Sequence, residues 1–231
     1  MDAGLYIVGT PIGNLADLGF RALEVLREAD EILAEDTRRT GRLLSRYELR
    51  KRMTSCHKFN EQKRVDTIVG AVRAGAAVAM VTDGGMPCVS DPGSRVVRGC
   101  REQGVPIVVI PGPSAVSSVV ALSGLGEQGF VFLGFLPHKS GARRRALAAR
   151  AQEPLALVLF ESPYRLLKLM GELEEVLPER RVFVGRELTK KFEEGIFGSP
   201  GDIRGHFDGR TVKGECAVVV EGCPRKPGER T

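Results

Sequence analysis

The sequence predicts an α/β fold with two domains: an N-terminal domain whose sheet is rich in parallel strands, and a smaller C-terminal α/β domain with a mixed sheet. Three observations lead to this prediction. In the first half of the chain, short apolar segments alternate with segments of helical periodicity. Each of those apolar segments ends in a loop that contains glycine, proline or helix-capping residues. In the second half, strand-like segments lie closer together along the chain.

A stretch near the middle of the N-terminal domain shows the pattern most clearly. Residues 78–82 are apolar or β-branched, which is typical of a strand buried on both faces of a parallel sheet. Asp83 and two glycines end this strand, at the edge where open α/β sheets bind their ligands. Residues 90–93 are predicted to cap the next helix, with Pro92 at its first position. An ordinary glycine-rich turn is the alternative interpretation of this stretch alone.

Other predicted strands end in similar loops. Residues 5–8 run into a Gly-Thr-Pro-Ile-Gly loop, whose spacing and proline argue against a dinucleotide pyrophosphate site. Residues 105–110 end at a Pro-Gly-Pro-Ser-Ala loop, in which Ser114 is predicted to cap a helix. The strand at residues 31–34 is followed by acidic and then basic residues, and Asp36 is able to cap the helix there. We expect these loops to converge at one sheet edge.

The second half is predicted to form a separate domain that completes a cleft. Its strands are expected at residues 130–136, 155–160, 182–185 and 217–220, and its helices at 143–151 and 163–176. The residues from 195 to 207 have a looser pattern. The predicted boundaries are 1–124 for the N-terminal domain, 125–223 for the C-terminal domain and 224–231 for a flexible tail rich in proline, glycine and charge.

Composition sets broad limits on function. The chain has 231 residues and a net charge of +5, which permits an anionic partner without requiring one. Its five cysteines are scattered and form no C-x-x-C pair, so neither a disulfide framework nor a zinc site is predicted. We find no signal peptide and no apolar run long enough to span a membrane, and we expect a cytoplasmic protein that binds no membrane.

Several motifs together resemble one known family. Each motif alone is weak, but they follow one another in the family's order over nearly the whole chain. They are similar to those of the tetrapyrrole-methylase superfamily, and within it to the branch that methylates ribosomal RNA. The motifs are residues 9–14, 35–38, 82–87, 90–93, 111–115, 134–137, 160–163 with Arg165, 186–190 and 213–215.

The resemblance implies a specific activity. It implies that S-adenosylmethionine binds in the cleft between the domains, and that a cytidine in the decoding region of 16S ribosomal RNA is methylated on its 2′-oxygen. It also implies a homodimer, with small-subunit ribosomal RNA or the 30S subunit as partner. From the residues themselves, no metal site is predicted. The cofactor-binding residues carried over from the family's loops are Ile12, Asp83, Gly84, Gly85, Met86, Ser114 and Ala115.

Methyl transfer requires the protein mainly to align the reacting atoms. The sulfonium methyl is already activated, and positioning alone can supply about 7 to 11 kcal/mol of a barrier. A hydroxyl nucleophile also benefits from a proton acceptor, for which Asp36, Glu35 and Glu161 are the candidates. Arg38 or Lys190 is a candidate to hold an adjacent phosphate. A structural ion pair is the alternative for each of these residues.

A basic cluster supports an RNA substrate. Positive charge is concentrated at residues 138–150, where phosphates would add salt-dependent affinity. A solvated helix face is the alternative. Methylation of a small corrin or porphyrin, and a non-enzymatic RNA-binding module, are the competing functions. The predicted RNA-binding residues are Arg38, Lys139, Arg143, Arg144, Arg165 and Lys190.

Overall fold

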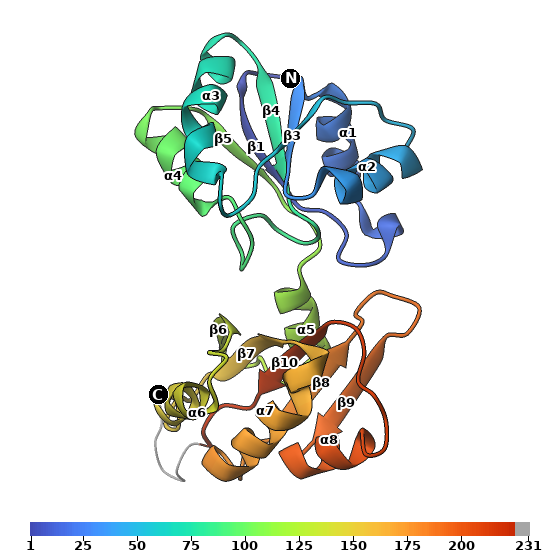
Figure 1. Cartoon of the computed structure of the whole chain (residues 1–231), viewed down its shortest axis with the longest axis vertical. Coiled ribbons are helices and arrows are strands. Elements are labelled where there is room, and N and C mark those ends of the chain that lie inside the picture. Colours follow the sequence, from blue (N-terminus) through green and yellow to red (C-terminus); the bar gives the residue numbers. More distant parts are fainter. Residues whose placement is uncertain (225–231) are drawn as a thin grey trace. The chain divides into compact units, whose positions relative to one another are not determined.

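The computed structural model describes residues 1–224, which form two compact units (Figure 1). The first unit is Met1–Ser114, and the second begins at Ala115. Helix α5 (Ala115–Ser123) lies before the predicted domain boundary at residue 124, yet it packs against two strands of the second unit. Residues 225–231, which make up most of the predicted tail, lie outside the described residues.

The first unit is built on a sheet of five parallel strands, in the order β3-β2-β4-β1-β5. Every residue of the central strand β4 and of its neighbour β1 is buried, as expected for a parallel sheet covered on both faces. The predicted parallel sheet is therefore confirmed. The strands are β1 (Gly4–Val8), β2 (Glu31–Ala34), β3 (Met53–Ser55), β4 (Ala77–Val81) and β5 (Ile107–Ile110).

Helices cover both faces of this sheet (Figure 1). On one face, a core cluster joins Leu26 and Leu44 from the helices to Val8 from the sheet. On the other face, Val69 and Cys100 pack with the sheet. A short 3₁₀ helix, η1 (Leu15–Asp17), follows β1. The first face is covered by α1 (Phe20–Glu28) and α2 (Thr37–Arg46), and the second by α3 (Glu61–Arg73) and α4 (Ser94–Glu102).

The second unit has a mixed five-stranded sheet, in the order β6-β7-β10-β8-β9. Strands β6 and β7 are parallel, and the other neighbouring pairs are antiparallel. This confirms the predicted mixed sheet. The strands are β6 (Phe130–Phe135), β7 (Ala156–Glu161), β8 (Val182–Arg186), β9 (Glu194–Gly198) and β10 (Cys216–Val220).

The helices of the second unit bury its core. One cluster joins Leu147, Leu169 and Ile203, from three different helices, to apolar residues of the sheet. Helix α5 instead packs against β8 and β10. The three helices of the cluster are α6 (Ser140–Ala148), α7 (Pro163–Val176) and α8 (Pro200–His206).

One predicted helix start differs from the structure. Helix α4 begins at Ser94 rather than at Pro92, and Gly93 is its N-cap with a φ of 126°. Cys88 and Ser90 also have positive φ, so the chain turns irregularly before the helix instead of capping it at Ser90. The buried carboxylate of Glu61 accepts the Gly93 N–H at 2.8 Å and holds the turn in place.

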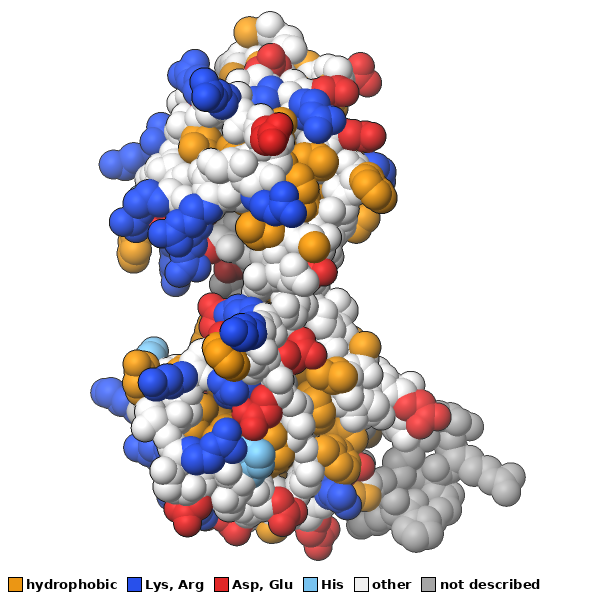
Figure 2. Space-filling view, turned by 90° about the vertical axis from the view of Figure 1, so that its right-hand side faces the viewer, with side chains coloured by type: hydrophobic (Ala, Val, Ile, Leu, Met, Phe, Trp, Pro, Cys, Tyr) orange, Lys and Arg blue, Asp and Glu red, His pale blue; other side chains and the backbone are white. Residues whose placement is uncertain are grey.

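Charged side chains are spread over the face of the molecule drawn in Figure 2. Within residues 1–224, no helix combines the length and the apolar character that a bilayer crossing requires.

Candidate functional site

Two of the predicted loops are joined by main-chain hydrogen bonds at the carboxyl edge of the first sheet. Thr10 donates its N–H to the Gly85 carbonyl at 3.0 Å, and Gly85 donates its N–H to the Thr10 carbonyl at 2.9 Å. The Thr10 hydroxyl also reaches the Thr82 carbonyl at 3.4 Å. These residues follow β1 and β4, which are neighbours in the sheet. The loops after β1 and β4 are thus bonded to each other.

Glycine is required where the loop after β1 meets the loop after β5. A Cβ on Gly9 would lie 2.7 Å from backbone atoms of Gly112 and 2.6 Å from Sδ of Met86. A Cβ on Gly112 would lie 2.7 Å from the Gly9 carbonyl oxygen. These distances are far below the optimal separation of about 3.5 to 4.0 Å between non-bonded carbon atoms. Only glycine lets three loops meet at this edge.

Six of the seven residues predicted to bind the cofactor lie on these three loops, and the seventh is Ala115. Gly85 has a φ of +88°, a conformation that favours glycine. An added Cβ there would approach Ile12 Cγ2 at 3.6 Å and the Pro113 carbonyl oxygen at 3.9 Å, which are ordinary contacts. Ala115 begins α5 and belongs to the second unit. The residues are Ile12 after β1, Asp83, Gly84, Gly85 and Met86 after β4, and Ser114 and Ala115 after β5.

Asp36, a predicted proton acceptor, is fully engaged in local structure. It is the N-cap of α2, and its Oδ1 accepts the Arg38 N–H at 2.9 Å. The Arg38 guanidinium donates from Nε to Oδ1 at 3.0 Å and from Nη2 to Oδ2 at 2.7 Å. These hydrogen bonds from Arg38 hold the pKa of Asp36 well below its ordinary range. A carboxylate bonded in this way is a weak base.

Glu35 and Asp83 link the ends of β2 and β4. Asp83 Oδ1 accepts the Asp36 N–H at 3.1 Å, and Glu35 Oε2 accepts the Asp83 N–H at 3.3 Å. Arg39 Nη1 lies 3.4 Å from Asp83 Oδ2. Burial raises the pKa of Glu35 above its ordinary value. Compared with Asp36, Glu35 is therefore the stronger base at this edge.

Thr82, the residue after β4, has a side-chain hydroxyl that is free to hydrogen-bond. Its side-chain hydroxyl is buried and has no hydrogen-bond partner among the described residues. Buried polar groups in proteins are nearly always hydrogen-bonded, so such an exception needs an explanation. Because Thr82 is next to Asp83 at the sheet edge, its hydroxyl is placed to hydrogen-bond a bound molecule.

In the second unit, Glu161 ends β7 and is only 2% exposed. Its Oε1 accepts the Ser162 N–H and the Arg165 Nε–H, each at 2.7 Å, while Oε2 has no partner among the described residues. Arg165 Nη1 lies 2.9 Å from His138 Nδ1. A guanidinium only donates hydrogen bonds, so His138 Nδ1 is the acceptor. Arg165, predicted to bind RNA, is thus shared between two protein groups.

Arg143 is another predicted RNA contact, and here the structure contradicts the prediction. The side chain is completely buried and pairs with Glu172 on α7, with Nη2 donating to Oε1 at 2.9 Å and Nε to Oε2. Its Nη1 reaches the carbonyl oxygens of Pro137 at 3.3 Å and His138 at 3.4 Å. Helix α6 begins at Ser140, earlier than predicted, and this turns Arg143 toward the core.

The remaining residues that were predicted to bind RNA differ in solvent exposure and in whether they form ion pairs. The side chains of Arg38 and Arg144 are 86% and 48% exposed, yet each is paired with a carboxylate. Lys190 lies 2.8 Å from two carboxylates. Lys139 is exposed and has no acidic partner among the described residues. Figure 2 shows Lys and Arg side chains gathered along one side of the face of the first unit drawn there.

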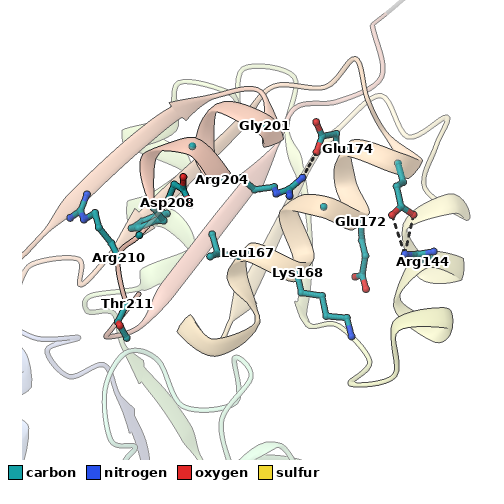
Figure 3. A pocket seen from close by; sticks show the side chains of 15 residues that line it. Arg144, Leu167, Lys168, Glu172, Glu174, Gly201, Arg204, Asp208, Arg210 and Thr211 are labelled. Carbon is teal, nitrogen blue, oxygen red and sulfur yellow. Dashed lines mark hydrogen bonds and ion pairs between the residues drawn. The ribbon is translucent and has the colours of Figure 1, made fainter.

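Sequence reasoning missed an open groove of about 1230 Å³ in the second unit, between α7 and α8 (Figure 3). Arg204 of α8 pairs with Glu174 of α7 at 2.8 Å across this groove. Arg144 pairs with Glu175 at 3.0 Å. Lys168 extends away from the Arg204–Glu174 pair. The groove could not be found from the sequence because α8 lies in a segment of loose pattern.

Comparison with known proteins identifies the family. Residues 4–203 match the family model of the tetrapyrrole (corrin/porphyrin) methylases, so the chain belongs to that family. A solved structure of uroporphyrin-III C-methyl transferase from Thermus thermophilus, complexed with S-adenyl homocysteine, has a TM-score of 0.65 with this chain. The two are 21% identical, over 94% of this chain and 97% of that one. At this identity the likeness concerns the fold.

Two relatives define the position within the family. Ribosomal RNA small subunit methyltransferase I of Thermotoga maritima is 44% identical over 218 residues, which cover 94% of this chain and 98% of that protein. The protein of the same name from Escherichia coli O157:H7 is 45% identical over 222 residues, covering 94% and 77%. Within the tetrapyrrole methylases, the chain therefore belongs with the ribosomal RNA small subunit methyltransferase I proteins. The resemblance inferred from the motifs is confirmed.

Proposed function

We propose that this protein transfers a methyl group from S-adenosylmethionine to the 2′-hydroxyl of a cytidine in the decoding region of 16S ribosomal RNA. The observation that carries the proposal is the edge of the first sheet, where three glycine-containing loops meet beside Glu35 and Asp83. The names of the two relatives support small-subunit ribosomal RNA as the substrate class.

The residues at this edge fit S-adenosylmethionine. The unpartnered Thr82 hydroxyl offers a hydrogen bond, and the Asp83 carboxylate, 28% exposed, suits the hydroxyl or ammonium groups of the cofactor. Gly85 leaves the main chain open to close approach. We assign the remaining contacts to Ile12, Gly84, Met86, Ser114 and Ala115. The cofactor supplies an activated methyl group when bound.

We assign Glu35 the role of proton acceptor. Glu35 would accept the proton of the ribose hydroxyl. The cofactor would supply the methyl group to the ribose oxygen and would leave as S-adenosylhomocysteine once its sulfur–methyl bond is broken. Asp36 is bonded on both oxygens, so it shapes the start of α2 and holds Arg38. Glu161, the third predicted candidate, anchors Arg165. The remaining contribution of the protein is alignment of the reacting atoms.

We further propose that the protein acts as a homodimer in the cytoplasm. A ribosomal RNA substrate supports the cytoplasm, the motif resemblance supports the homodimer, and one surface feature supports self-association. Val108 and Val109, on the sheet-edge strand β5, are 36% and 58% exposed. Exposed apolar residues on an unpaired strand edge favour contact with another chain. Sedimentation of the purified protein tests the assembly.

A transfer assay tests the proposed activity. The protein is incubated with radiolabelled S-adenosylmethionine and either small ribosomal subunits or a uroporphyrinogen. We expect label in the 16S RNA, mapped by mass spectrometry to the 2′-oxygen of one cytidine. Methylation of the tetrapyrrole instead would favour the second candidate function, which the fold of the solved uroporphyrin enzyme supports. Cofactor binding without transfer to either substrate would contradict both.

A further inference from the structure

The second unit displays a group of aromatic and basic side chains where its two parallel strands end. Strands β6 and β7 are adjacent and parallel, and the end of β6, Phe135, is the register partner of Phe160 in β7. The loops that follow both strands therefore leave the sheet at the same edge. We call the following six residues the aromatic edge: Phe135, His138, Lys139, Tyr164, Arg165 and Lys168.

Two large aromatic side chains of this edge face solvent. Tyr164 is 91% exposed and Phe135 is 59% exposed. The Phe135 ring packs against the Phe160 ring at a centroid distance of 5.7 Å, which fixes its orientation. Among the described residues, the Tyr164 hydroxyl has no hydrogen-bond partner. Neither exposed ring contributes much to the core of the unit, so their display at one edge calls for another explanation.

Hydrogen bonds from two arginines fix the conformation of the aromatic edge. Arg165 is anchored on the buried Glu161 and contacts His138 at 2.9 Å, which ties the loop after β6 to the first turn of α7. Arg143, also buried, bonds the carbonyl oxygens of Pro137 and His138 from below. Rigid support of this kind lowers the entropy cost of binding a ligand.

The charge of the edge is positive. Lys139 and Lys168 are exposed and have no acidic partner among the described residues. The nearby carboxylates of Glu161 and Glu172 are each 2% exposed, and each is paired with an arginine. Tyr164 and Lys168 are four residues apart on α7, so they share one helix face. The exposed carboxylates of Glu174 and Glu175, which line the groove together with Lys168, are paired with Arg204 and Arg144. Exposed rings therefore lie beside cations that have no ion-pair partner among the described residues.

We propose that the aromatic edge binds unpaired nucleotides of the RNA substrate, with bases stacked on Tyr164 and Phe135 and phosphates held by Lys139 and Lys168. Aromatic rings interleaved with cations are the usual means of holding single-stranded nucleic acid. A-form duplex offers no exposed base faces to such rings. This inference rests on the proposed function, because it names the form of RNA that the enzyme holds.

A second copy of the chain fits this surface less well. In a two-fold symmetric dimer, the same patch meets itself across the axis. Lys139 and Lys168 would then face their own counterparts, and like charges brought together at an interface oppose association. Phosphates, in contrast, neutralise these cations.

The test compares two RNA probes and four variants. The probes are a labelled hairpin with a single-stranded loop and a fully paired duplex of the same composition. We expect Tyr164→Ala to weaken binding of the loop probe by about 5- to 150-fold, the range that loss of one stacked base produces. Tyr164→Phe keeps the ring and should bind as the unchanged protein does. Phe20→Ala removes a ring that is 88% exposed in the first unit and serves as the matched control.

A further readout separates a binding role from a structural one. With small ribosomal subunits as substrate, Tyr164→Ala should raise KM by a similar factor and leave both kcat and S-adenosylmethionine affinity unchanged. Unchanged loop binding in Tyr164→Ala and Phe135→Ala would overturn the inference. So would a change of oligomeric state in these variants with RNA affinity preserved, since the edge would then join two copies. Failure of the unchanged protein to methylate ribosomal RNA would instead refute the proposed function.

Discussion

Neighbouring carboxylates at the edge of the first sheet differ in their hydrogen bonding. Both oxygens of Asp36 accept hydrogen bonds from Arg38, which lowers its pKa. Glu35 accepts only the Asp83 N–H at 3.3 Å among the described hydrogen bonds, and burial raises its pKa. Although Glu35 and Asp36 are adjacent in the sequence, Asp36 is therefore a structural carboxylate and Glu35 is the candidate base.

Substitution of Glu35 by glutamine tests this division. We expect Glu35→Gln to lower kcat by about 10²- to 10⁴-fold, because the proton acceptor is removed, and to leave cofactor affinity nearly unchanged. Asp36→Asn keeps a good helix cap and should change kcat much less. Single-turnover methyl transfer measures both effects. A full rate in Glu35→Gln would show that alignment alone suffices.

The pH dependence follows from the direction of the Glu35 shift. A proton acceptor works only when ionised, so kcat should rise with pH through the Glu35 pKa, which lies above the ordinary glutamate value. Because the folded-state pKa is raised, any stability that Glu35 contributes is present at pH below its unfolded pKa and is lost as pH rises through the folded one. The acidic limb of the kcat profile should vanish in Glu35→Gln.

Gly85 offers a test of the proposed cofactor site. We expect Gly85→Val to abolish binding of S-adenosylmethionine, because the branched side chain fills space at the edge of the sheet. The matched control is Gly75→Val, since Gly75 has a similar φ of +97° and open space around it. Both variants carry backbone strain of about 1 to 3 kcal/mol. Calorimetry with both folded variants decides, and equal loss of affinity in the two would implicate strain instead of the pocket.

At the scale of elements, the buried Arg143–Glu172 pair joins α6 to α7 and supports the loop after β6. We expect Arg143→Ala to lower the free energy of unfolding by about 3 to 5 kcal/mol, because it leaves the Glu172 carboxylate buried and unpaired. Arg144→Ala is the control next to it in the sequence. Arg144 and its partner Glu175 are about half exposed, so its loss should change stability by about 1 kcal/mol or less.

Denaturant unfolding measures the two variants side by side. Glu172 adds a pH dependence to the same experiment. Burial alone would raise its pKa, but hydrogen bonds from Arg143 and Ser140 outweigh burial and lower it. The stability contributed by this pair is therefore present at pH above the unfolded pKa of Glu172, and it is lost as pH falls through the folded one. Similar unfolding free energies for the two arginine variants would contradict the assignment of Arg143 to the core.

Elements with strong periodicity could be predicted from the sequence, and short or irregular ones could not. The pattern for α7 predicted residues 163–176, the bounds that the structure has. Strand β3 has only three residues, too few for a periodic signal. Helix α8 has a capping box at Ser199 and a proline in its first turn, but its seven residues are too short to show a helical stripe.

Prediction of the candidate site from the sequence also succeeded where local sequence decides and failed where distant contacts decide. The loops of the first sheet could be placed from their glycines and strand ends, because local sequence determines both. The burial of Arg143 could not, since it depends on Glu172, which is 29 residues away in the sequence. The charge run alone did not distinguish this arginine from exposed Arg144. Pairing between helices decides which cations are available to a partner.

At the scale of the whole molecule, a net charge of +5 is modest for a protein that binds RNA. Many of its arginines are committed to ion pairs within the chain, as Arg186 is with Glu194. Affinity for RNA then depends on a few unpaired cations at specific positions more than on total charge. The salt dependence of binding counts such cations directly.

Among the residues that the structure describes, Lys139 is one such unpaired cation. Removal of one cation that binds a phosphate should reduce the slope of log affinity against log salt concentration by about 0.7 to 0.9. We expect this reduction for Lys139→Ala, whose charge has no acidic partner among the described residues. Arg144 shares its charge with Glu175 and should contribute less. Arg204→Ala is the control, because Arg204 is paired with Glu174 in the groove between α7 and α8. RNA binding measured from low to moderate salt gives the slopes, and equal slopes for Lys139→Ala and the unchanged protein would remove Lys139 from the RNA interface.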